Sequence, residues 1–377
     1  MAGIYIHIPY CKTKCPYCDF FSVTNGYDEK VFIKSLLKEI HLQRNYLQKQ
    51  KIQTIYFGGG TPSLLSPEAV KLVNEKLYKT FNIAQNAEIT IECNPDDVSP
   101  GFFKKLKSFG FNRLSLGIQS FHEAALRFLG RRHTVKQNDL AIQWALKEGF
   151  ENITIDLIYG LPGSSLYTWK ATLEKAFTYP FKHLSAYHLT IEPGTTFGHM
   201  LNKGELNEIP EENSLDQFRI IMDYAHRKGF EHYELSSFAL PDFYSRHNLG
   251  YWFQKPYLGL GPSAHSYDGK TRQWNFSNIK LYNDSVLNGQ IPCKRENLTM
   301  QDHFNEYLIT RLRTRWGVDL DEISQKFGSG YRDYLVKAAS FFIEQQYLKR
   351  SGDILILTRE GKFISDAIFR ELIWSRE

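Results

Sequence analysis

The sequence predicts an α/β fold in which a barrel of parallel strands is followed by a smaller C-terminal α+β domain. Short β-rich runs alternate about six times with amphipathic stretches, which is the pattern of parallel strands joined by crossover helices. An open doubly wound sheet fits this alternation as well as a barrel does. Polar and glycine-rich residues stand at the C-terminal ends of the runs, however, and a barrel gathers those ends on one face. This convergence favours the barrel.

The predicted strands are short runs rich in β-branched and aromatic residues. They are Gly3–Ile8, Thr54–Phe57, Glu88–Glu92, Arg113–Ile118, Ile153–Ile158 and His183–Leu189. The first predicted helix, Asp28–Leu47, repeats its apolar residues mostly at helical spacing and begins at a suitable N-cap, Asp28. The other predicted helices of the barrel are Pro67–Phe81, Pro100–Phe109, Val135–Glu148, Leu166–Phe177 and Ser214–Lys228.

Residues suited to ligand binding stand at the ends of these strands. They are the loop Cys11–Cys18, then Gly59, Gly60 and Thr61 in GGGTP, then Glu92, Gln119, and Asp156 with the following GLPG. A carboxylate inside an apolar strand costs free energy unless it has a partner. Asp156, which interrupts ITIDLIYG, therefore indicates a functional role. Two interpretations of Gln119, a solvated loop amide and a ligand contact, are about equally favoured.

The chain divides into three predicted parts. Residues 1–235 form the barrel with its cysteine loop, and residues 236–294 are aromatic and glycine-rich with little periodicity. We expect this second part to be irregular and to face a ligand or an interface. Residues 295–377 combine VDLDEISQKFG, a helix over about 331–346 and a hairpin signal at Ser351–Gly352. That combination is typical of a small winged-helix-like module.

Composition and charge are those of an ordinary soluble protein. Hydrophobic residues make up 42% and charged residues 23%, and the formal net charge is +5. No apolar run is long enough to span a membrane as a helix, and the N-terminus has no export signal. We therefore expect a cytoplasmic protein, in which thiols stay reduced. No block of Lys and Arg resembles a nucleic-acid-binding tail.

Three of the five cysteines, Cys11, Cys15 and Cys18, lie within eight residues in CKTKCPYC. A disulfide is disfavoured in a reducing compartment, and three thiols leave one over. A structural zinc site needs four ligands, and no fourth Cys or His lies at a suitable spacing. An iron–sulfur cluster is normally held by four thiolates, so three would leave one iron open to a small chelating molecule. Tyr17 would shield such a cluster, and Lys12 and Lys14 would offset its charge.

The run YIHIPYCKTKCPYCDF resembles the opening of radical S-adenosylmethionine (SAM) enzymes, whose CxxxCxxC loop binds a [4Fe–4S] cluster with SAM on the fourth iron. More narrowly, the whole chain resembles oxygen-independent coproporphyrinogen III oxidases and their relatives, the HemW-type heme chaperones. The resemblance implies a partial (β/α)6 barrel of the radical SAM type over residues 1–235. It also implies SAM contacts at matching positions, which are Tyr5, Tyr17, Gly59, Gly60, Thr61, Glu92, Gln119, Arg131 and Asp156. The resemblance leaves open which of the two adjacent arginines, Arg131 or Arg132, reaches the site.

Three features separate the relatives. The oxidases carry a further cysteine two residues after the third, where this chain has Phe20, and they have an extension before the first strand. HNLGYW at 247–252 instead resembles the HNxxYW motif that the chaperones use for heme. The resemblance implies that His247 ligates heme iron, that Tyr251 and Trp252 stack on the macrocycle, and that Arg246 pairs with a propionate. His133, His188 and His265 stay open as alternative ligands. From the residues alone, His247 reads as a hydrogen-bonded loop histidine.

The resulting hypothesis is a cytoplasmic heme chaperone that carries a [4Fe–4S] cluster and SAM and delivers heme to acceptor hemoproteins, membrane-bound respiratory enzymes among them. The alternative is an enzyme that oxidises coproporphyrinogen III to protoporphyrinogen IX. A DNA-binding role would need a basic recognition helix, and the stretch near Arg332 and Lys337 has only those two cations beside Asp333. We therefore expect no nucleic-acid partner. The sequence leaves the oligomeric state open, a homodimer included.

Overall fold

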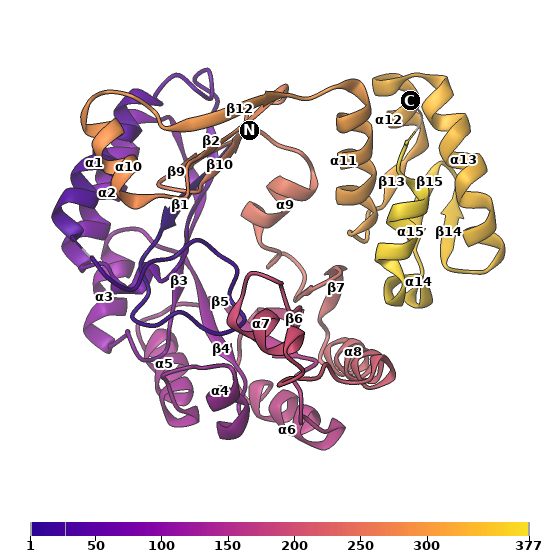
Figure 1. Cartoon of the computed structure of the whole chain (residues 1–377), viewed down its shortest axis with the longest axis horizontal. Helices are drawn as coiled ribbons and strands as arrows, with labels where there is room; N and C mark the ends of the chain where they lie inside the picture. The colour runs from indigo at the N-terminus through magenta and orange to yellow at the C-terminus, as the bar shows by residue number, and fades with distance from the viewer. Residues whose placement is uncertain (1, 27, 376–377) are drawn as a thin grey trace.

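A computed structural model describes residues 2–26 and 28–375. Its centre is a curved sheet of six parallel strands in chain order (Figure 1). The strands are β1 (Ala2–Ile8), β2 (Ile52–Gly59), β3 (Ile83–Cys93), β4 (Arg113–Gln119), β5 (Asn152–Tyr159) and β6 (His183–His188). Each predicted strand overlaps one of these. Continuous parallel pairing from β1 to β6 places all of their C-terminal ends at one edge of the sheet.

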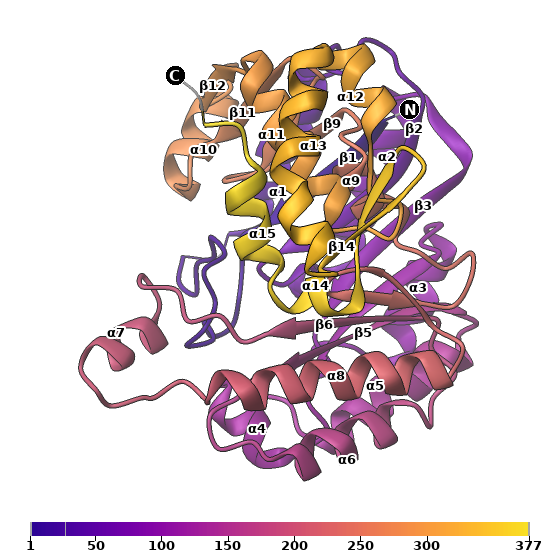
Figure 2. The same ribbon diagram turned by 90° about the vertical axis from the view of Figure 1, so that its right-hand side faces the viewer.

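Helices cover the outer face of this sheet (Figures 1 and 2). They are α1 (Glu29–Leu42), α2 (Pro67–Thr80), α3 (Pro100–Ser108), α5 (Val135–Lys147), α6 (Leu166–Ala176) and α8 (Glu211–Arg227). Side chains cap most of their N-termini, as Asp28 does for α1 and Thr134 for α5. The sequence prediction left out two short helices, α4 (Glu123–Phe128) and α7 (Thr196–Asn202). Figure 2 shows α7 projecting away from the barrel on long connections.

Strands β3 to β6 alternate between an apolar outer face and a polar inner face. The outward side chains, such as Leu114, Leu116, Ile153 and Ile155, belong to the main hydrophobic core. The inward side chains line a cavity and are Thr90, Glu92, Arg113, Ser115, Thr154, Asp156, His183 and Ser185. A barrel of this size is normally filled by branched apolar side chains. The polar alternation therefore marks a ligand cavity.

Residues 236–294 are more regular than the sequence prediction stated. They contain α9 (Arg246–Trp252), β9 (Tyr257–Leu260), β10 (His265–Tyr267), β11 (Thr271–Asn275), α10 (Ile279–Leu287) and the start of β12 (Cys293–Asn297). Strand β9 pairs in parallel with β1, and β10 to β12 extend that edge in antiparallel fashion. At the other edge, β6 is followed by β8 (Ser237–Ala239) and β7 (Glu231–Glu234). Strands of three to five residues between glycines give too few alternations to be recognised from the sequence.

The C-terminal part has its own hydrophobic core and a three-stranded sheet in the order β13-β15-β14. Its elements are α11 (Met300–Leu312), β13 (Val318–Asp319), α12 (Leu320–Phe327), α13 (Ser329–Glu344), β14 (Leu348–Ser351), β15 (Ile354–Leu357), α14 (Arg359–Phe363) and α15 (Ser365–Leu372). Gly352 adopts a φ of 61° in the β14–β15 hairpin, where the sequence predicted one. This is a winged-helix-like arrangement of three helices and a hairpin. Arg332, in its candidate recognition helix, pairs with Asp353 at 2.8 Å.

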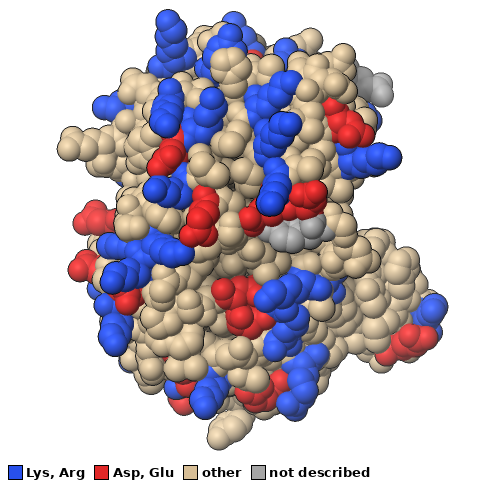
Figure 3. Space-filling model, turned by 90° about the vertical axis from the view of Figure 1, so that its left-hand side faces the viewer, with Lys and Arg blue, Asp and Glu red and all other residues tan. Residues whose placement is uncertain are grey.

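The C-terminal part docks on the barrel through polar contacts. Arg313 donates to Glu234 at 2.6 Å, and Lys362 Nζ lies 3.0 Å from His232 Nδ1. On the opposite face of the molecule, Lys and Arg side chains are interspersed with Asp and Glu (Figure 3). Among the described residues, no helix is long and apolar enough to cross a membrane.

Candidate functional site

The three clustered cysteines lie on the loop between β1 and α1. The base of this loop is closed by two backbone hydrogen bonds, Val23 N–H to Pro9 O at 2.7 Å and Cys11 N–H to Val23 O at 3.1 Å. Cys11, Cys15 and Cys18 are half-buried free thiols, and all three line one cavity of about 60 Å³. The fold therefore gathers around one cavity the three thiols that lie within eight residues of the sequence.

The donor set fits an iron–sulfur cluster better than a single ion. In the part of the chain that the structure describes, no three His, Cys, Asp or Glu side chains stand close enough to hold one metal ion. A [4Fe–4S] cluster spreads its thiolate ligands over separate irons and so separates them further than one ion would. Three thiols around one cavity fit such a cluster in kind and number. They would hold three irons and leave the fourth to a non-protein ligand.

Two side chains donate hydrogen bonds to these sulfurs. Thr61 Oγ1 lies 3.3 Å from Cys11 Sγ, and Arg131 Nη1 lies 3.6 Å from Cys15 Sγ. Such donors stabilise thiolate charge and tune a cluster that the thiolates hold. Burial raises the pKa of the Cys18 thiol above its ordinary value. Lys12, expected beside the cluster, instead pairs with Asp97 at 2.6 Å.

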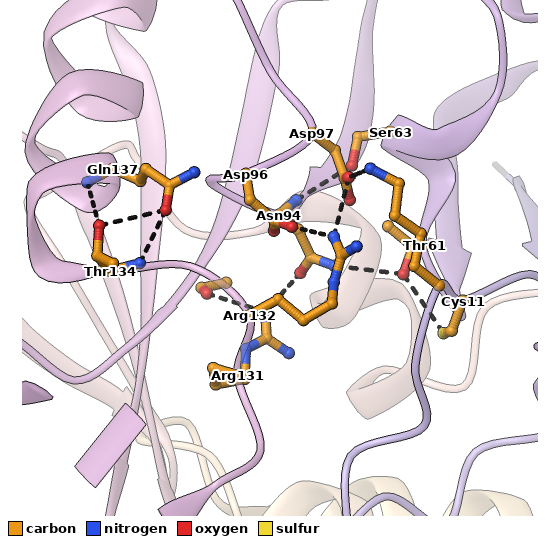
Figure 4. Close-up of polar contacts among 12 residues, drawn as sticks. Cys11, Thr61, Ser63, Asn94, Asp96, Asp97, Arg131, Arg132, Thr134 and Gln137 are labelled. Carbon is orange, nitrogen blue, oxygen red and sulfur yellow. Dashed lines mark hydrogen bonds and ion pairs between the residues drawn. The ribbon is translucent and has the colours of Figure 1, made fainter. Parts of the chain in front are cut away.

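Of the two neighbouring arginines, Arg131 is the one that contacts a clustered thiol, whereas Arg132 lies against Asp96 and Asp97 (Figure 4). Its Nη2 donates to Asn94 Oδ1 at 2.5 Å and to the Gly117 carbonyl at 3.2 Å, which fixes the guanidinium across the ends of β3 and β4. Its Nε is buried without a hydrogen-bond partner among the described residues.

The GGGTP loop after β2 approaches the cysteine loop so closely that side chains are excluded. A Cβ atom on Gly60 would lie 2.8 Å from the Tyr10 carbonyl oxygen and 2.9 Å from that of Ile8. Gly59 adopts a φ of 109°, which strains any residue with a side chain. Its N–H donates to Glu92 at 3.2 Å. Thr61, which is buried, then reaches Cys11, so the loop presents backbone directly beside the thiols.

Two buried carboxylates, Glu92 and Asp156, line the barrel interior. Glu92 accepts from Tyr56 OH at 2.8 Å, and burial, with repulsion from Asp156, raises its pKa to about 7. Asp156 accepts from Ser115 Oγ at 2.9 Å, and burial raises its pKa to about 6. Groups that titrate near neutral pH inside a cavity can bind or release a proton when a charged ligand enters.

The main cavity has a volume of about 500 Å³. Most of the predicted contacts line it, namely Tyr17, Cys18, Gly59, Gly60, Thr61, Glu92, Gln119, Arg131 and Asp156. Gln119 has a φ of 63°, a left-handed conformation at the end of β4. Tyr5 is not among the lining residues, because its ring stacks on Tyr56 and its hydroxyl lies 3.1 Å from His7 Nδ1. Tyr5 therefore lies behind the cavity wall.

Sequence reasoning missed several residues of this cavity. Asn94 joins Arg131 to Thr61, and Tyr56 and Ser115 hold the two carboxylates. Arg113 and His183 line its inner end. One signal would have found most of them, because β3 to β6 place a polar residue at every second position. In parallel strands covered by helices on one face, such alternation indicates a polar cavity on the other face.

The HNLGYW motif forms the short helix α9, which packs on the inner side of the sheet. The Glu88 carboxylate accepts the backbone N–H groups of Arg246 and His247 at 3.1 and 3.0 Å, so it caps the helix. His247 is only 3% exposed. Its Nδ1 lies 2.8 Å from Thr54 Oγ1 and its Nε2 lies 2.8 Å from Tyr251 OH. Both ring nitrogens are thus engaged, and burial lowers the pKa of His247 to about 3.

A second, largely apolar cavity of about 210 Å³ adjoins this helix. His247, Leu249, Tyr251 and Phe253 line it together with Tyr257. Arg246 also lines this cavity, where it donates to the Asn86 carbonyl and to Gln53, and Trp252 packs beneath the Arg313 guanidinium at 4.7 Å. The alternative histidines differ in access. His188 and His265 are exposed, whereas His133 is buried against the Ile118 carbonyl.

Comparison with known proteins places these features in a family. Residues 5–176 match the family model of the radical SAM superfamily, and residues 298–364 match that of the HemN C-terminal domain. The chain is 32% identical to the heme chaperone HemW of Bacillus subtilis, with 98% of both chains covered. It is 33% identical to the heme chaperone HemW of Haemophilus influenzae, covering 100% of this chain and 98% of the relative.

A solved structure shows the same fold. Coproporphyrinogen III oxidase (HemN) from Escherichia coli superposes with a TM-score of 0.86 at 23% identity, over 99% of this chain and 90% of that one. The predicted α/β barrel with a smaller C-terminal domain is confirmed, and so is the resemblance on which the prediction relied. Radical SAM proteins use a [4Fe–4S] cluster and SAM, and the thiols, glycines and carboxylates described above fit both. The chain belongs to the HemW family within the radical SAM superfamily.

Proposed function

We propose that this protein binds heme and delivers it to acceptor hemoproteins, respiratory enzymes among them, while its barrel holds the [4Fe–4S] cluster and SAM. The observation that carries this proposal is full-length similarity to proteins named as heme chaperones, together with the HNLGYW helix beside an apolar cavity. A cytoplasmic location agrees with five cysteines that are all free thiols. The barrel supplies the site for the cluster, and α9 supplies the site for heme.

The apolar cavity beside α9 is the proposed heme site. A macrocycle needs an apolar surface with few polar groups, and aromatic residues such as Tyr251 and Tyr257 provide it. His247 would ligate the iron through a neutral imidazole, the form that its lowered pKa favours. Because Thr54 and Tyr251 engage both ring nitrogens, ligation requires α9 to rearrange. A helix of seven residues that contains Gly250 is suited to such a movement.

The barrel cavity would hold SAM with its residues in distinct roles. Cys11, Cys15 and Cys18 would bind the cluster, whose reduction of SAM supplies a radical when the group is used catalytically. Backbone at Gly59 and Gly60 would meet the methionine amine, and Glu92 would accept from the ammonium or ribose. Arg131 would offset the charge of the thiolates. Tyr5 would act through Tyr56 rather than by contact, because it does not line the cavity.

A second candidate function is the oxidation of coproporphyrinogen III. It is favoured by the fold shared with the oxidase and by two carboxylates in the cavity that titrate near neutral pH. Phe20 argues against it. The oxidases carry a cysteine at this position, whereas here an apolar ring that is 68% exposed stands at the cavity mouth.

Three measurements on protein purified without oxygen test the proposal. We expect iron and sulfide contents that correspond to one cluster per chain, stoichiometric heme binding, and transfer of that heme to an apo-hemoprotein. His247→Ala should lower heme affinity, whereas His199→Ala, at an exposed histidine of α7, should leave it unchanged. Turnover of coproporphyrinogen III by reduced protein with SAM would instead establish the oxidase activity. Equal heme affinity in His247→Ala and the wild type would remove His247 as the ligand.

A further inference from the structure

The inner end of the barrel cavity contains polar groups to which the contacts described so far assign no ligand. One residue from each of four consecutive strands contributes to it, namely Thr90, Arg113, Thr154 and His183. Sheet register makes Thr90 and Arg113 neighbours on β3 and β4, and Thr154 and His183 neighbours on β5 and β6. They form a layer in which each residue lies one inward position nearer the N-terminal end of its own strand than Glu92, Ser115, Asp156 and Ser185. A ligand must therefore pass the two carboxylates to reach this layer from the mouth.

Arg113 is a buried cation whose close partners are all neutral. It is 1% exposed. Its guanidinium donates to Asn152 Oδ1 at 2.5 Å, to Thr154 Oγ1 at 2.7 Å and to the Phe243 carbonyl at 3.3 Å. None of the ion pairs found within residues 2–26 and 28–375 includes it. Buried charges are ordinarily paired, so an anion in the cavity would complete this site.

His183 adds an unused polar atom to the same layer. Its ring is 1% exposed, and its Nε2 lies 2.7 Å from Tyr233 OH. The Tyr233 oxygen accepts the Ser245 N–H at 3.3 Å, and its own proton can be donated to His183 Nε2. In that tautomer Nδ1 carries the ring proton, yet Nδ1 has no hydrogen-bond partner in the described structure. Thr90 Oγ1 is buried and unpartnered in the same way.

We propose that Arg113, His183 and Thr90 form a subsite for a carboxylate group at the inner end of the barrel cavity. The available groups are donors, a planar guanidinium is the best match for a carboxylate, and the buried location strengthens each contact. Asp156, one layer toward the mouth, is held by Ser115 at 2.9 Å and shares the field of Arg113 without an ion pair to it. The subsite is independent of whether the chain binds heme.

The test uses propionate as the probe and the cluster-loaded protein without oxygen. Carboxyl-labelled propionate is titrated at neutral pH, and its binding is followed by NMR line broadening. We expect saturable binding that Arg113→Gln weakens by about tenfold or more, because a charge-assisted contact is lost. Arg44→Gln, at an exposed arginine, is the matched control and should bind as the wild type does. Absence of saturable binding to the wild type would overturn the proposal.

A second variant controls for misfolding of Arg113→Gln. This control is needed because Arg113 also donates hydrogen bonds to Asn152 and to the Phe243 carbonyl. Thr90→Val removes a buried hydroxyl that has no partner, so it should keep or raise the melting temperature. It should also weaken propionate binding by about threefold. If both Thr90→Val and Arg113→Gln bound propionate as the wild type does, the binding would lie elsewhere and the subsite would be refuted.

Competition identifies where the carboxylate comes from. If SAM displaces propionate, the carboxylate of SAM occupies the subsite. If heme displaces it and heme dimethyl ester does not, the ligand is a propionate arm of a tetrapyrrole. If neither displaces it, the subsite takes a free small carboxylic acid. Each of these results supports a carboxylate subsite and assigns its source.

Discussion

Tyr56 donates its hydroxyl proton to Glu92 across 2.8 Å inside the barrel, and this bond joins the second strand to the third at the level of the proposed SAM site. Glu92 also accepts the N–H of Gly59, so both of its oxygen atoms are engaged. Burial nevertheless raises the pKa of Glu92 to about 7. The carboxylate is therefore held in place by hydrogen bonds and is still half protonated near neutral pH.

Glu92→Gln should change how stability depends on pH. The pKa of Glu92 rises from an ordinary 4.5 to about 7 on folding, so the folded state binds more protons between these values. The stability of the wild type should therefore fall as pH rises from 4.5 to 7, and this part of the slope should vanish in Glu92→Gln. At pH 8 the variant should be more stable by about 3 kcal/mol. Denaturant melts at pH 5 and 8 measure both effects.

SAM binding by the same variant separates stability from function. If Glu92 accepts from the SAM ammonium or ribose, SAM affinity in the wild type should rise with pH through 7, as the carboxylate ionises. Glu92→Gln should bind SAM more weakly, and its affinity should not change over this range. A variant that kept the wild-type pH profile would show that another group, such as Asp156, controls the binding.

Replacing any one of the three clustered cysteines should abolish the cluster. Cys11→Ser, Cys15→Ser and Cys18→Ser should each lose most of the iron and sulfide after anaerobic reconstitution, because a cluster with two protein thiolates is poorly held. Cys293→Ser, at a half-buried thiol outside the cluster loop, is the matched control and should keep full iron content. Iron and sulfide assays with the visible absorption spectrum measure the result. A wild-type spectrum from Cys15→Ser would contradict the ligand assignment.

Gly60→Ala tests whether the GGGTP loop needs close backbone approach. The added methyl would meet two carbonyl oxygens of the cysteine loop, at 2.8 Å from Tyr10 and 2.9 Å from Ile8. Since neither is a flexible side chain, the two loops must separate. We expect a lower melting temperature and at least tenfold weaker SAM binding, because a small misplacement of binding groups costs much affinity. Gly194→Ala, where a Cβ meets open space, should leave both unchanged.

The sequence predicted the parallel strands and most of the barrel helices because their periodicities extend over whole elements. Ile153–Ile158 and Leu166–Phe177, for example, match β5 and α6 within a residue or two. Strands β9 to β11 were not predicted, because three to five residues between glycines show almost no hydrophobic periodicity. Their places are set instead by tertiary pairing, such as Tyr257 beside Gly3.

The sequence indicated candidate site residues that belong to short motifs, and it missed residues that act only through a neighbouring side chain. GGGTP and CKTKCPYC stand out as short sequence patterns, whereas Asn94 matters only because the fold brings Arg131 and Thr61 to it. Tyr5 is the opposite case, because it belongs to a motif but its surroundings are set by other strands. Its motif position predicts a cofactor contact, which stays a prediction, and in the structure its ring stacks on Tyr56. Which inward residue reaches the cavity depends on neighbouring side chains that no single stretch of sequence contains.

Thr54→Val should increase heme affinity if α9 must rearrange for His247 to reach the iron. The substitution removes the hydroxyl that lies 2.8 Å from His247 Nδ1, and a typical hydrogen bond contributes about 1 kcal/mol. The closed arrangement of α9 would lose that stabilisation, so heme should bind about fivefold more tightly. Thr54→Ser keeps the hydroxyl and should bind as the wild type does.

The spectrum of bound heme makes this prediction specific to His247. Heme bound to Thr54→Val should keep the axial-ligand spectrum of the wild type, and the double variant Thr54→Val, His247→Ala should lose the gain in affinity. If Thr54→Val bound heme no more tightly than Thr54→Ser, the bond between Thr54 and His247 would not oppose ligation. His247 would then act by supporting Tyr251, whose hydroxyl lies 2.8 Å from Nε2, and an exposed histidine such as His188 or His265 would take the iron.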